Sequence, residues 1–474
     1  AGAGSAYRSS GAGVPVDAGK LRRDLGRAVA AGLDELEGEG VPGQDAATSR
    51  SRPERGRRTA TAPRDPGIEG AAGGGQAKPR PEHVHAAEYA HLEVEIEQPR
   101  PAVLAPFFAA LRRTARAQDA HITRIAHYGD SSIATDLITH TMRRRLQRRF
   151  GDAGHGFVLT AKGYMPYRHR DVKHEASPHW SLRPIMKGSD KDGRYGYGGV
   201  LYRSRSGAWA RFGPDPEAPV GQSVSRFIVF YERHPLGGGL RLKLDNGPVR
   251  LLATRATARV DAREVIDVPP GVHTLELRHA GGGTVHLYGV ALERSGPGVV
   301  YDSLGLVGAR ARRLLNYNGG HIKAQLKARP VDLLILGFGG NEAGDPVSTV
   351  AHYEAIYRRV IRRMKAGRKD LPCLLFAPLD QARRDERGAI ATMPSVPRIV
   401  AGQRAAARAE GCAFYDTFQA MGGKGAMRRW YRSHPRLAMG DFRHATPAGY
   451  GVIAQMFYKA LLKAFAEDNA RLSR

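Results

Sequence analysis

The chain has 474 residues, 42% of them hydrophobic, which is enough for two or three domains with buried cores. Its formal net charge of +27 favours an anionic environment (nucleic acid, an anionic membrane or an anionic cell envelope), although GC-rich coding would also enrich Arg. No zinc-finger spacing, RNA-recognition signature or basic run interleaved with aromatic residues supports nucleic acid, and no run of about 18 apolar residues could span a membrane.

Residues 1–88 are predicted to form a low-complexity, largely disordered arm, because Gly, Ala, Pro, Ser and Arg dominate them. Apolar residues at helical spacing in 18–36 predict a short docking helix within this arm. The chain begins at Ala1 rather than Met, which is consistent with processing or trimming that removed a signal peptide.

Residues 89–155 are predicted to be the first part of an α/β domain. The apolar spacing predicts a helix at 103–115, a strand at 122–127 and a second helix at 132–150. The tripeptide Gly129-Asp130-Ser131 therefore lies on a turn from a strand to a helix.

Residues 156–297 have a different pattern, with short alternating segments separated by Gly, Pro, Asp and Asn. This pattern predicts an all-β sandwich, such as a jelly roll, inserted into the α/β domain. The predicted strands are 200–205, 208–212, 226–231, 240–244, 249–252, 257–260, 264–268, 272–277 and 284–292.

Residues 298–474 are predicted to complete the α/β domain. Short apolar strands alternate with helices, which predicts a parallel sheet covered on both faces. Thr446 and Pro447 fit the N-cap and first position of a final helix. The expected strands are 299–301, 331–337, 373–377 and 413–415, and the other helices are 309–315, 347–364 and 396–410.

Three motifs are expected to meet at one edge of this sheet, where active sites of parallel α/β folds form: Gly129-Asp130-Ser131, Gly339-Gly340-Asn341 and Asp441-Phe442-Arg443-His444. Acyl transfer needs a hydroxyl nucleophile, a base, and a group that orients the base. We therefore expect Ser131 to be the nucleophile, His444 the general base and Asp441 its orienting acid. This chemistry requires no metal and no organic cofactor.

Acyl transfer also needs donors for the developing oxyanion. The backbone N–H groups of Ser131 and Gly308 and the side-chain amide of Asn341 are the candidates. Gly305 is an alternative to Gly308, and one of the two glycines would then serve only the turn.

These motifs resemble the blocks of the SGNH (GDSL-like) hydrolase superfamily. The resembling blocks are Tyr128-Gly129-Asp130-Ser131, the run 302–309, Gly339-Gly340-Asn341-Glu342 and Asp441-Phe442-Arg443-His444. The resemblance implies a flavodoxin-like three-layer domain, Ser131, Asp441 and His444 as catalytic residues, and Ser131, Gly308 and Asn341 as the oxyanion hole. Two departures are the GGN form of the third block and the long gap between Ser131 and Gly308.

The runs HYGDSSIATDLIT, RRFGDAGHGFV and VVYDSLGLVGARA resemble bacterial peptidoglycan O-acetylesterases, in which a carbohydrate-binding-like β-sandwich interrupts the SGNH domain. This resemblance implies an extracytoplasmic enzyme of the periplasm or cell envelope, or a secreted one, that removes muramoyl 6-O-acetyl groups. Alternatives are an O-acetyltransferase on the same scaffold, an SGNH esterase or lipase for another acylated glycan or small ester, and an inert wall-binding protein.

Several other residues have a structural and a functional interpretation. Asp130 is expected to cap the turn behind the nucleophile, and His127 to be a packed or solvent-edge residue rather than a second base. The histidines at 169, 174 and 179 fit a loop better than a metal site. Sugar stacking is one interpretation of Trp180, Trp209 and Tyr202. A place in the core of the sandwich is favoured over it by about two to one.

The two cysteines, Cys373 and Cys412, each lie in a short apolar run. We favour two buried free thiols, while a single bridge is the alternative in an oxidising compartment.

Overall fold

The folded region includes residues that the sequence assigned to the arm. The structure is a computed structural model that describes residues 79–99, 103–162 and 167–474; the expected helix at 18–36 lies outside these residues. Val84 is buried, and the N–H of Arg80 donates to the carbonyl of Ala115 at 2.7 Å. The segment 79–88 therefore packs on the α/β part, and the predicted arm extends too far.

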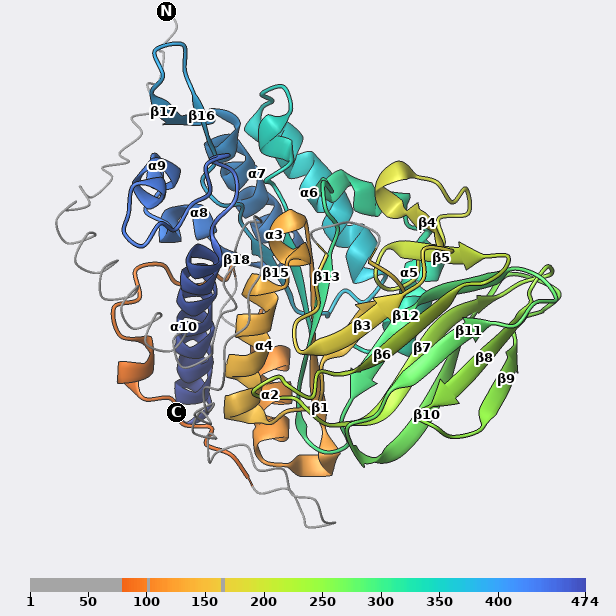
Figure 1. Cartoon of the computed structure of the whole chain (residues 1–474). Coiled ribbons are helices and arrows are strands. Elements are labelled where there is room, and N and C mark those ends of the chain that lie inside the picture. Colours follow the sequence, from red (N-terminus) through yellow and green to blue (C-terminus); the bar gives the residue numbers. More distant parts are fainter. Residues whose placement is uncertain (1–78, 100–102, 163–166) are drawn as a thin grey trace, which may run out of the picture. The chain divides into compact units, whose positions relative to one another are not determined.

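Five parallel strands form the central sheet, in the order β13-β1-β14-β15-β18 (Figure 1). Their bounds are β1 Ile122–Gly129, β13 Gly298–Gly305, β14 Leu333–Gly337, β15 Cys373–Phe376 and β18 Ala413–Tyr415. The predicted parallel sheet is confirmed, and β13 extends four residues beyond the predicted strand.

Neighbouring side chains of the sheet enter different packing environments, so both of its faces are covered. Leu375 and Phe414 belong to a core that includes helix residues such as Ile361. Phe376 and Tyr415 instead pack on Phe457, with ring centroids 5.1 and 5.0 Å away. This alternation explains why the strands read as continuous apolar runs.

Helices α2, α4 and α10 meet around Phe465, whose ring lies 5.6 Å from Phe108 and 5.5 Å from Phe150. Helices α6 and α7 pack on each other through Gly402 and Tyr353. No described helix is long and apolar enough to cross a bilayer. The helices are α2 Ala105–Ala115, α3 Ser131–Ala134, α4 Leu137–Phe150, α5 Gly319–Ala328, α6 Val350–Lys365, α7 Ser395–Glu410, α8 Thr417–Ala420, α9 Ala426–Tyr431 and α10 Pro447–Leu472.

Two helix predictions have different outcomes. The cap of α10 is confirmed, because the hydroxyl of Thr446 accepts the N–H of Gly449 at 3.2 Å and Pro447 begins the helix. The single helix expected at 132–150 is wrong. Asp136 interrupts it with a φ of +56°, and its carboxylate pairs with Arg143 at 2.7 Å.

The predicted helix at 309–315 is also wrong. It is a 3₁₀ helix, η4 (Ala311–Asn316), followed by α5, which the pattern did not indicate. The remaining 3₁₀ helices are η1 Ala86–Tyr89, η2 Gln118–Ala120, η3 Ile185–Lys187 and η5 Glu342–Gly344.

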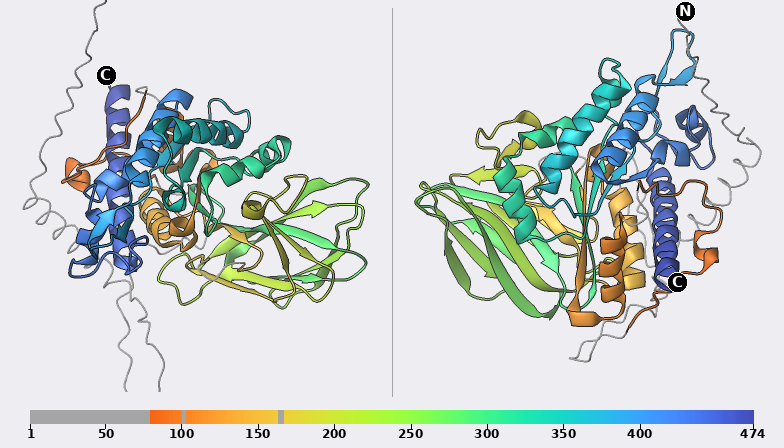
Figure 2. Two further views of the ribbon diagram at one scale, coloured as in Figure 1. Left: turned by 90° about the horizontal axis from the view of Figure 1, so that it is seen from above. Right: turned by 180° about the vertical axis from the view of Figure 1, so that it is seen from behind.

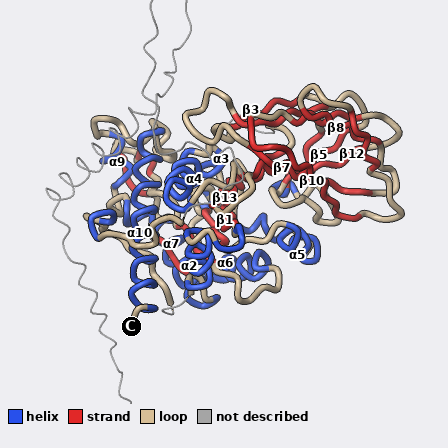
Figure 3. Tube along the Cα trace, turned by 90° about the horizontal axis from the view of Figure 1, so that it is seen from below, coloured by secondary structure: helices blue, strands red, loops and turns tan. Residues whose placement is uncertain are grey.

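The segment between α4 and β13 forms two antiparallel sheets, which gather on one side of the α/β part and contact it at α5 (Figure 3). One sheet has the order β10-β7-β12-β5-β4, with β2 also paired to β12, and the other has β3-β6-β11-β8-β9. The strands are β2 Gly156–Leu159, β3 Val172–Ala176, β4 Ser181–Pro184, β5 Val200–Ser204, β6 Trp209–Pro214, β7 Val224–Arg233, β8 Gly239–Leu244, β9 Val249–Ala253, β10 Val260–Gly271, β11 Leu275–His279 and β12 Val285–Glu293.

Two features of these sheets differ from the predicted pattern. Strands β2, β3 and β4 were not predicted, because they are short and their apolar alternation is weak. The strand expected at 257–260 is wrong, because only Val260 of it lies in a strand. Val260 begins the long strand β10, which contains the segment expected at 264–268 and has Pro269-Pro270-Gly271 at its irregular end rather than in a separate turn.

The first and last strands of the segment lie side by side. β2 pairs with β12 antiparallel, with Gly156 opposite Leu292 and Leu159 opposite Gly289. The chain thus leaves and re-enters the α/β part at neighbouring points. Figure 2 shows the sandwich, coloured yellow to green, on one side of the α/β part. Such close ends allow a whole β domain to interrupt a sheet without separating β1 from β13.

A buried ionic cluster joins the sandwich to the α/β part. Arg329 is 2.7 and 2.8 Å from the two carboxylate oxygens of Asp302 and 2.7 Å from Glu293, which Arg124 also binds. Burial would raise the pKa of Glu293, but the two guanidinium groups outweigh it and lower that pKa to about 2. Tyr197 from the sandwich donates its hydroxyl to Asp302 at 2.8 Å.

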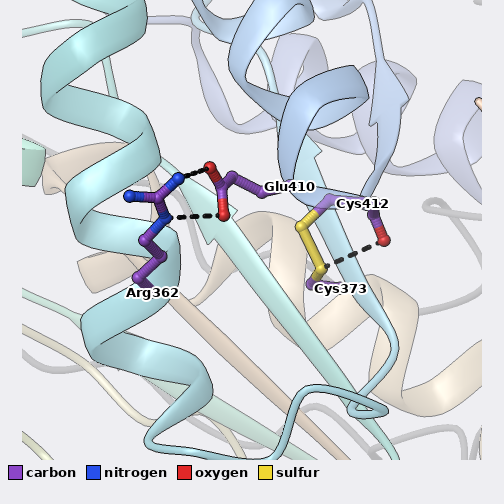
Figure 4. The surroundings of a disulfide bond; sticks show 5 residues. Arg362, Cys373, Glu410 and Cys412 are labelled. Carbon is purple, nitrogen blue, oxygen red and sulfur yellow. Dashed lines mark hydrogen bonds and ion pairs between the residues drawn. A yellow bond between two sulfur atoms is a disulfide. The ribbon is translucent and has the colours of Figure 1, made fainter.

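Cys373 and Cys412 form a disulfide, with Cα atoms 4.7 Å apart, so the favoured prediction of two free thiols is wrong. Parallel pairing of β15 with β18 brings the starts of these strands together, which spacing along the sequence could not reveal. Beside this disulfide, an ion pair between Arg362 and Glu410 joins α6 to the end of α7 (Figure 4).

Candidate active site

Ser131 is held at the carboxyl end of β1 by a tight turn. A side chain at Gly129 would place its Cβ 2.6 Å from the carbonyl oxygen of Gly337, so only glycine fits between the strands. Asp130 then caps α3, because its Oδ1 accepts the N–H and the hydroxyl of Ser132 at 3.0 and 2.8 Å. The predicted capping role of Asp130 is confirmed.

The structure brings Ser131, His444 and Asp441 into one hydrogen-bonded line. The Oγ of Ser131 lies 3.0 Å from Nε2 of His444, and Nδ1 of His444 lies 2.6 Å from Oδ2 of Asp441. The other oxygen of Asp441 accepts the N–H groups of Arg443 and His444 at 2.9 and 3.1 Å. This loop therefore fixes the imidazole with one nitrogen toward the hydroxyl.

The charge of Asp441 is stabilised in this loop. Partial burial would raise the pKa of the carboxyl group, but hydrogen bonds from the His444 ring and the two backbone N–H groups outweigh burial and lower it. The side chains of Asp441 and His444 are 45% and 38% exposed. The line of three residues thus opens to solvent instead of lying in a closed channel.

Asn341 lies beside Ser131, half-buried, and one N–H of its amide donates to the carbonyl of Ala309 at 3.0 Å. The amide has a second N–H, so Asn341 can tether the loop after β13 and still donate to a ligand. The structure thereby places two of the three predicted oxyanion donors, Ser131 and Asn341, in one pocket.

Gly308 and Gly305 occupy different environments. Gly308 has a φ of +76°, in the left-handed region, and no atom lies within 4 Å of where its Cβ would be. A Cβ at Gly305 would lie 2.1 Å from the backbone nitrogen of Ala134, so Gly305 serves close packing against α3. Gly308 is not among the residues that line the pocket, and the loop tethered by Asn341 carries it.

The pocket at Ser131 is small, with a volume of about 70 Å³. One wall is apolar and consists of Phe338, Phe376, Ala377, Pro378 and Leu379. Its polar side chains are Asp130, Ser131, Ser132, Asn341, Gln381, Arg443, His444 and Tyr450. Such a pocket can hold a short acyl group against the apolar wall, with its carbonyl near Ser131.

Two residues at the site were not predicted. Glu342 is buried, and its Oε1 accepts the N–H of Ala311 at 2.7 Å; burial raises the pKa of its carboxyl group to about 7. Gln381 lines the pocket, and its buried Oε1 has no partner among the described residues. Glu342 directly follows the Asn341 motif, whereas no sequence signal distinguishes Gln381.

The other histidines and the aromatic residues have structural surroundings. His127 is fully buried, bonds to the hydroxyl of Tyr301 at 2.9 Å and has a pKa lowered to about 3 by burial, so it is packed, as predicted. His174 lies on β3, not in a loop, stacked on Phe212. The described residues contain no group of three or more His, Cys, Asp or Glu side chains that could hold a metal ion.

Trp180 and Tyr202 are buried in the sandwich core, which is the interpretation that the sequence favoured. Trp209 is only half-buried, and the guanidinium of Arg211 lies 5.0 Å from its ring centroid. The guanidinium of Arg211 therefore partly covers the face of the Trp209 ring.

Comparison with known proteins places these features in a family context. Residues 270–452 match the GDSL-like Lipase/Acylhydrolase family, a range that includes Gly308, Asn341, Asp441 and His444 but begins after Ser131. No curated protein sequence matches the chain.

Among solved structures, one titled "Peptidoglycan O-acetylesterase in action, 5 min" is similar, with 22% identity over 78% of this chain and 99% of that chain and a TM-score of 0.65. A family two carbohydrate esterase from Cellvibrio japonicus is also found, at 11% identity, coverage of 62% and 98%, and a TM-score of 0.24. The first of these structures shares the fold of this chain.

Proposed function

Since the chain contains a GDSL-like lipase/acylhydrolase domain and is an ester-hydrolysing enzyme, we propose that it is a serine O-acetylesterase acting on an acetylated glycan, with peptidoglycan as the substrate. The observation that carries the proposal is the line from the Ser131 hydroxyl through His444 to Asp441, with distances of 3.0 and 2.6 Å.

In the first step, Ser131 Oγ attacks the acetyl carbonyl carbon while His444 Nε2 takes the hydroxyl proton. Asp441 accepts the Nδ1–H of the ring, which selects the tautomer whose Nε2 is free to act as a base. The carbonyl oxygen becomes an oxyanion, and the Ser131 N–H and the second N–H of Asn341 donate to it. Gly308, which lies on the loop tethered by Asn341, is proposed as a third donor.

In the second step, the tetrahedral intermediate collapses and the bond to the sugar oxygen breaks. His444 gives its proton to that oxygen, so the sugar leaves with a free hydroxyl and the acetyl group stays on Ser131. Water then attacks the acetyl-enzyme with His444 as base, and acetate leaves. A sugar hydroxyl in place of this water would give the acetyltransferase alternative.

The size of the pocket supports an acetyl group. Its volume of about 70 Å³ and the wall formed by Phe376, Ala377 and Leu379 leave little room for a longer acyl chain. The exposure of Asp441 and His444 supports a polymeric alcohol, because the leaving sugar can remain outside the pocket.

Two further observations support peptidoglycan and an extracytoplasmic location. The sequence blocks resemble those of peptidoglycan O-acetylesterases, and a solved structure with that title shares the fold over 78% of this chain. The disulfide fits an oxidising compartment, such as the periplasm or the exterior of the cell.

The decisive experiment measures acetate release in plain buffer from O-acetylated peptidoglycan, acetylated xylan and 4-nitrophenyl acetate. We expect all three to be hydrolysed, with the highest kcat/KM on peptidoglycan. Preference for xylan would overturn the substrate assignment. Release of 4-nitrophenol that requires an added sugar acceptor, with the acetyl group recovered on that acceptor, would favour the acetyltransferase.

A further inference from the structure

Nearly all of the net positive charge lies in residues 79–474. Residues 1–78 contain 12 Lys and Arg and 10 Asp and Glu, which leaves almost the whole net charge of +27 to residues 79–474. Part of this net charge precedes residues 441–444, which we call the catalytic loop because they carry Asp441 and His444. Residues 417–440 contain five Lys and Arg and no Asp or Glu. No acid within this stretch neutralises the charge, and the flanking Asp416 and Asp441 pair with Arg404 and His444.

Three arginines reach the catalytic loop from three different elements. Arg443 lies between Phe442 and His444, lines the Ser131 pocket and has its guanidinium beside Gly344. Arg384 belongs to the hairpin β16–β17 (Ala382–Arg384 and Ile390–Thr392), and Arg436 follows α9. Figure 1 shows the hairpin, α9 and α3 at the same end of the described α/β part.

Aromatic rings hold two of these arginines in place. The guanidinium of Arg384 lies 5.2 Å from the ring centroid of Phe442, and that of Arg436 lies 4.3 Å from the ring of Tyr431. The two rings touch edge to face, with centroids 4.9 Å apart. The cations are thus arranged on a stack that includes a residue of the catalytic loop itself.

Backbone hydrogen bonds fix the same arrangement. The N–H of Ala382 donates to the carbonyl of Phe442 at 2.9 Å, which joins the hairpin to the catalytic loop. The hydroxyl of Thr446 donates to the carbonyl of Arg436 at 2.9 Å, which joins the segment after α9 to the start of α10. The backbone segments that carry Arg384 and Arg436 are therefore joined to the segment around His444.

These guanidinium groups are exposed, and within 79–99, 103–162 and 167–474 no carboxylate pairs with any of the three. Other charges lie close to them along the chain. Asp441 binds His444, and Asp385, whose carboxylate accepts N–H groups of its own turn, shares the hairpin with Arg383, Glu386 and Arg387. Asp345, which follows Gly344, pairs with Arg310. Most arginines of the sandwich–α/β boundary, in contrast, are paired. The three cations are available for an external anion.

We propose that Arg384, Arg436 and Arg443 form an arginine rim that binds carboxylates of the polymeric substrate and so draws its acetylated hydroxyl to Ser131. This inference rests on the proposed function and deepens it, because peptidoglycan carries carboxylates on its peptide stems, and on the lactyl groups from which a stem has been removed. A planar guanidinium binds a carboxylate through two parallel hydrogen bonds, which fixes orientation as well as charge.

The test compares kcat/KM on O-acetylated peptidoglycan with kcat/KM on uncharged 4-nitrophenyl acetate, as a ratio within each variant. We expect Arg384→Gln with Arg436→Gln to lower this ratio by about 3- to 10-fold, mainly through KM. Added salt should reduce the ratio of the native protein more than that of the double variant.

Matched controls separate charge from position. Arg359→Gln with Arg408→Gln removes the same charge from exposed positions on α6 and α7 and should leave the ratio unchanged. Arg384→Lys with Arg436→Lys keeps the charge and should restore part of the ratio. Peptidoglycan whose carboxyl groups have been amidated should be a poorer substrate for the native protein.

Binding of the Ser131→Ala protein to insoluble peptidoglycan gives a readout that needs no catalysis. An equal loss of the ratio in both double Gln variants, or equal binding of native and amidated polymer, would overturn the arginine rim. Binding that depends on the carboxylates but without acetate release by the native protein would instead overturn the proposed function and leave the rim intact.

Discussion

The cluster around Arg329 and the cluster around His444 both join charged side chains from distant parts of the chain, yet they are built in opposite ways. Arg329, Glu293 and Asp302 are almost completely excluded from solvent, and both oxygens of Asp302 accept two hydrogen bonds each. At the other cluster, Asp441 and His444 are 45% and 38% exposed. The saturated cluster fixes one geometry, while the open one leaves Ser131 and His444 free to exchange a proton with a ligand.

This difference predicts that the open cluster controls rate and the saturated one controls stability. The largest effect is expected for Ser131→Ala, which removes the nucleophile. We expect kcat on 4-nitrophenyl acetate to fall by about 10⁴- to 10⁶-fold, while the free energy of unfolding changes by less than about 0.5 kcal/mol. Urea unfolding followed by circular dichroism checks the second part. Activity near that of the native protein would remove Ser131 from the mechanism.

Arg329→Met tests the saturated cluster. It leaves the Asp302 carboxylate and part of Glu293 buried without their partner, so we expect the free energy of unfolding to fall by about 3–5 kcal/mol. Lys463→Met is the matched control, because Lys463 pairs with exposed Glu95 and Glu467 and should cost less than about 1 kcal/mol. Similar small losses in both variants would contradict the contrast between the clusters.

Asn341→Ala affects both the chemistry of the open cluster and a structural contact. It removes a proposed oxyanion donor and the tether to Ala309, so we expect kcat to fall by about 10²- to 10³-fold. Asn341→Asp has nearly the same shape but no N–H and should lose a similar factor. A change confined to KM would mean that Asn341 binds substrate and does not stabilise the oxyanion.

Glu342→Gln gives the smallest effect, and it depends on pH. Burial raises the pKa of Glu342 from its ordinary value of 4.5 to about 7, so the folded protein keeps a proton that the unfolded chain has released. The stability of the native protein should therefore fall as pH rises from about 4.5 to 7.

Glutamine cannot ionise, and its carbonyl can still accept the N–H of Ala311. We expect the variant to match the native protein at about pH 4 and to be more stable by up to about 3 kcal/mol above pH 7. Urea unfolding at several pH values measures the difference. A constant difference across this range would show that folding does not change the pKa of Glu342.

The same contrast explains what could be predicted from the sequence. The line of Ser131, Asp441 and His444 is encoded by short motifs at strand ends and before a helix, and the parallel sheet itself by continuous apolar strands. The Arg329 cluster has no such signal, because its members lie on four separate elements and only the docking of the sandwich brings them together.

Local departures from the predicted elements also could not be predicted from the sequence. Asp136 interrupts a regular helical pattern because its carboxylate is captured by Arg143 and by the N–H of Arg170. The pairing of Cys373 with Cys412 follows from strand order, which a list of strands does not contain. Gln381 enters the pocket from a loop without any motif. In each case a tertiary contact decided against the local preference.

The interruption of the sheet also has a consequence for folding. The central strand β1 pairs on both sides with strands made after the whole sandwich; the N–H of Arg124 bonds to Asp332, 208 residues later. During synthesis from the amino end, β1 must therefore wait without partners while β2 to β12 emerge. Contacts of such high sequence separation form slowly. The sandwich can close first through β2 and β12, and this shortens the effective loop that β1 must close to reach β13.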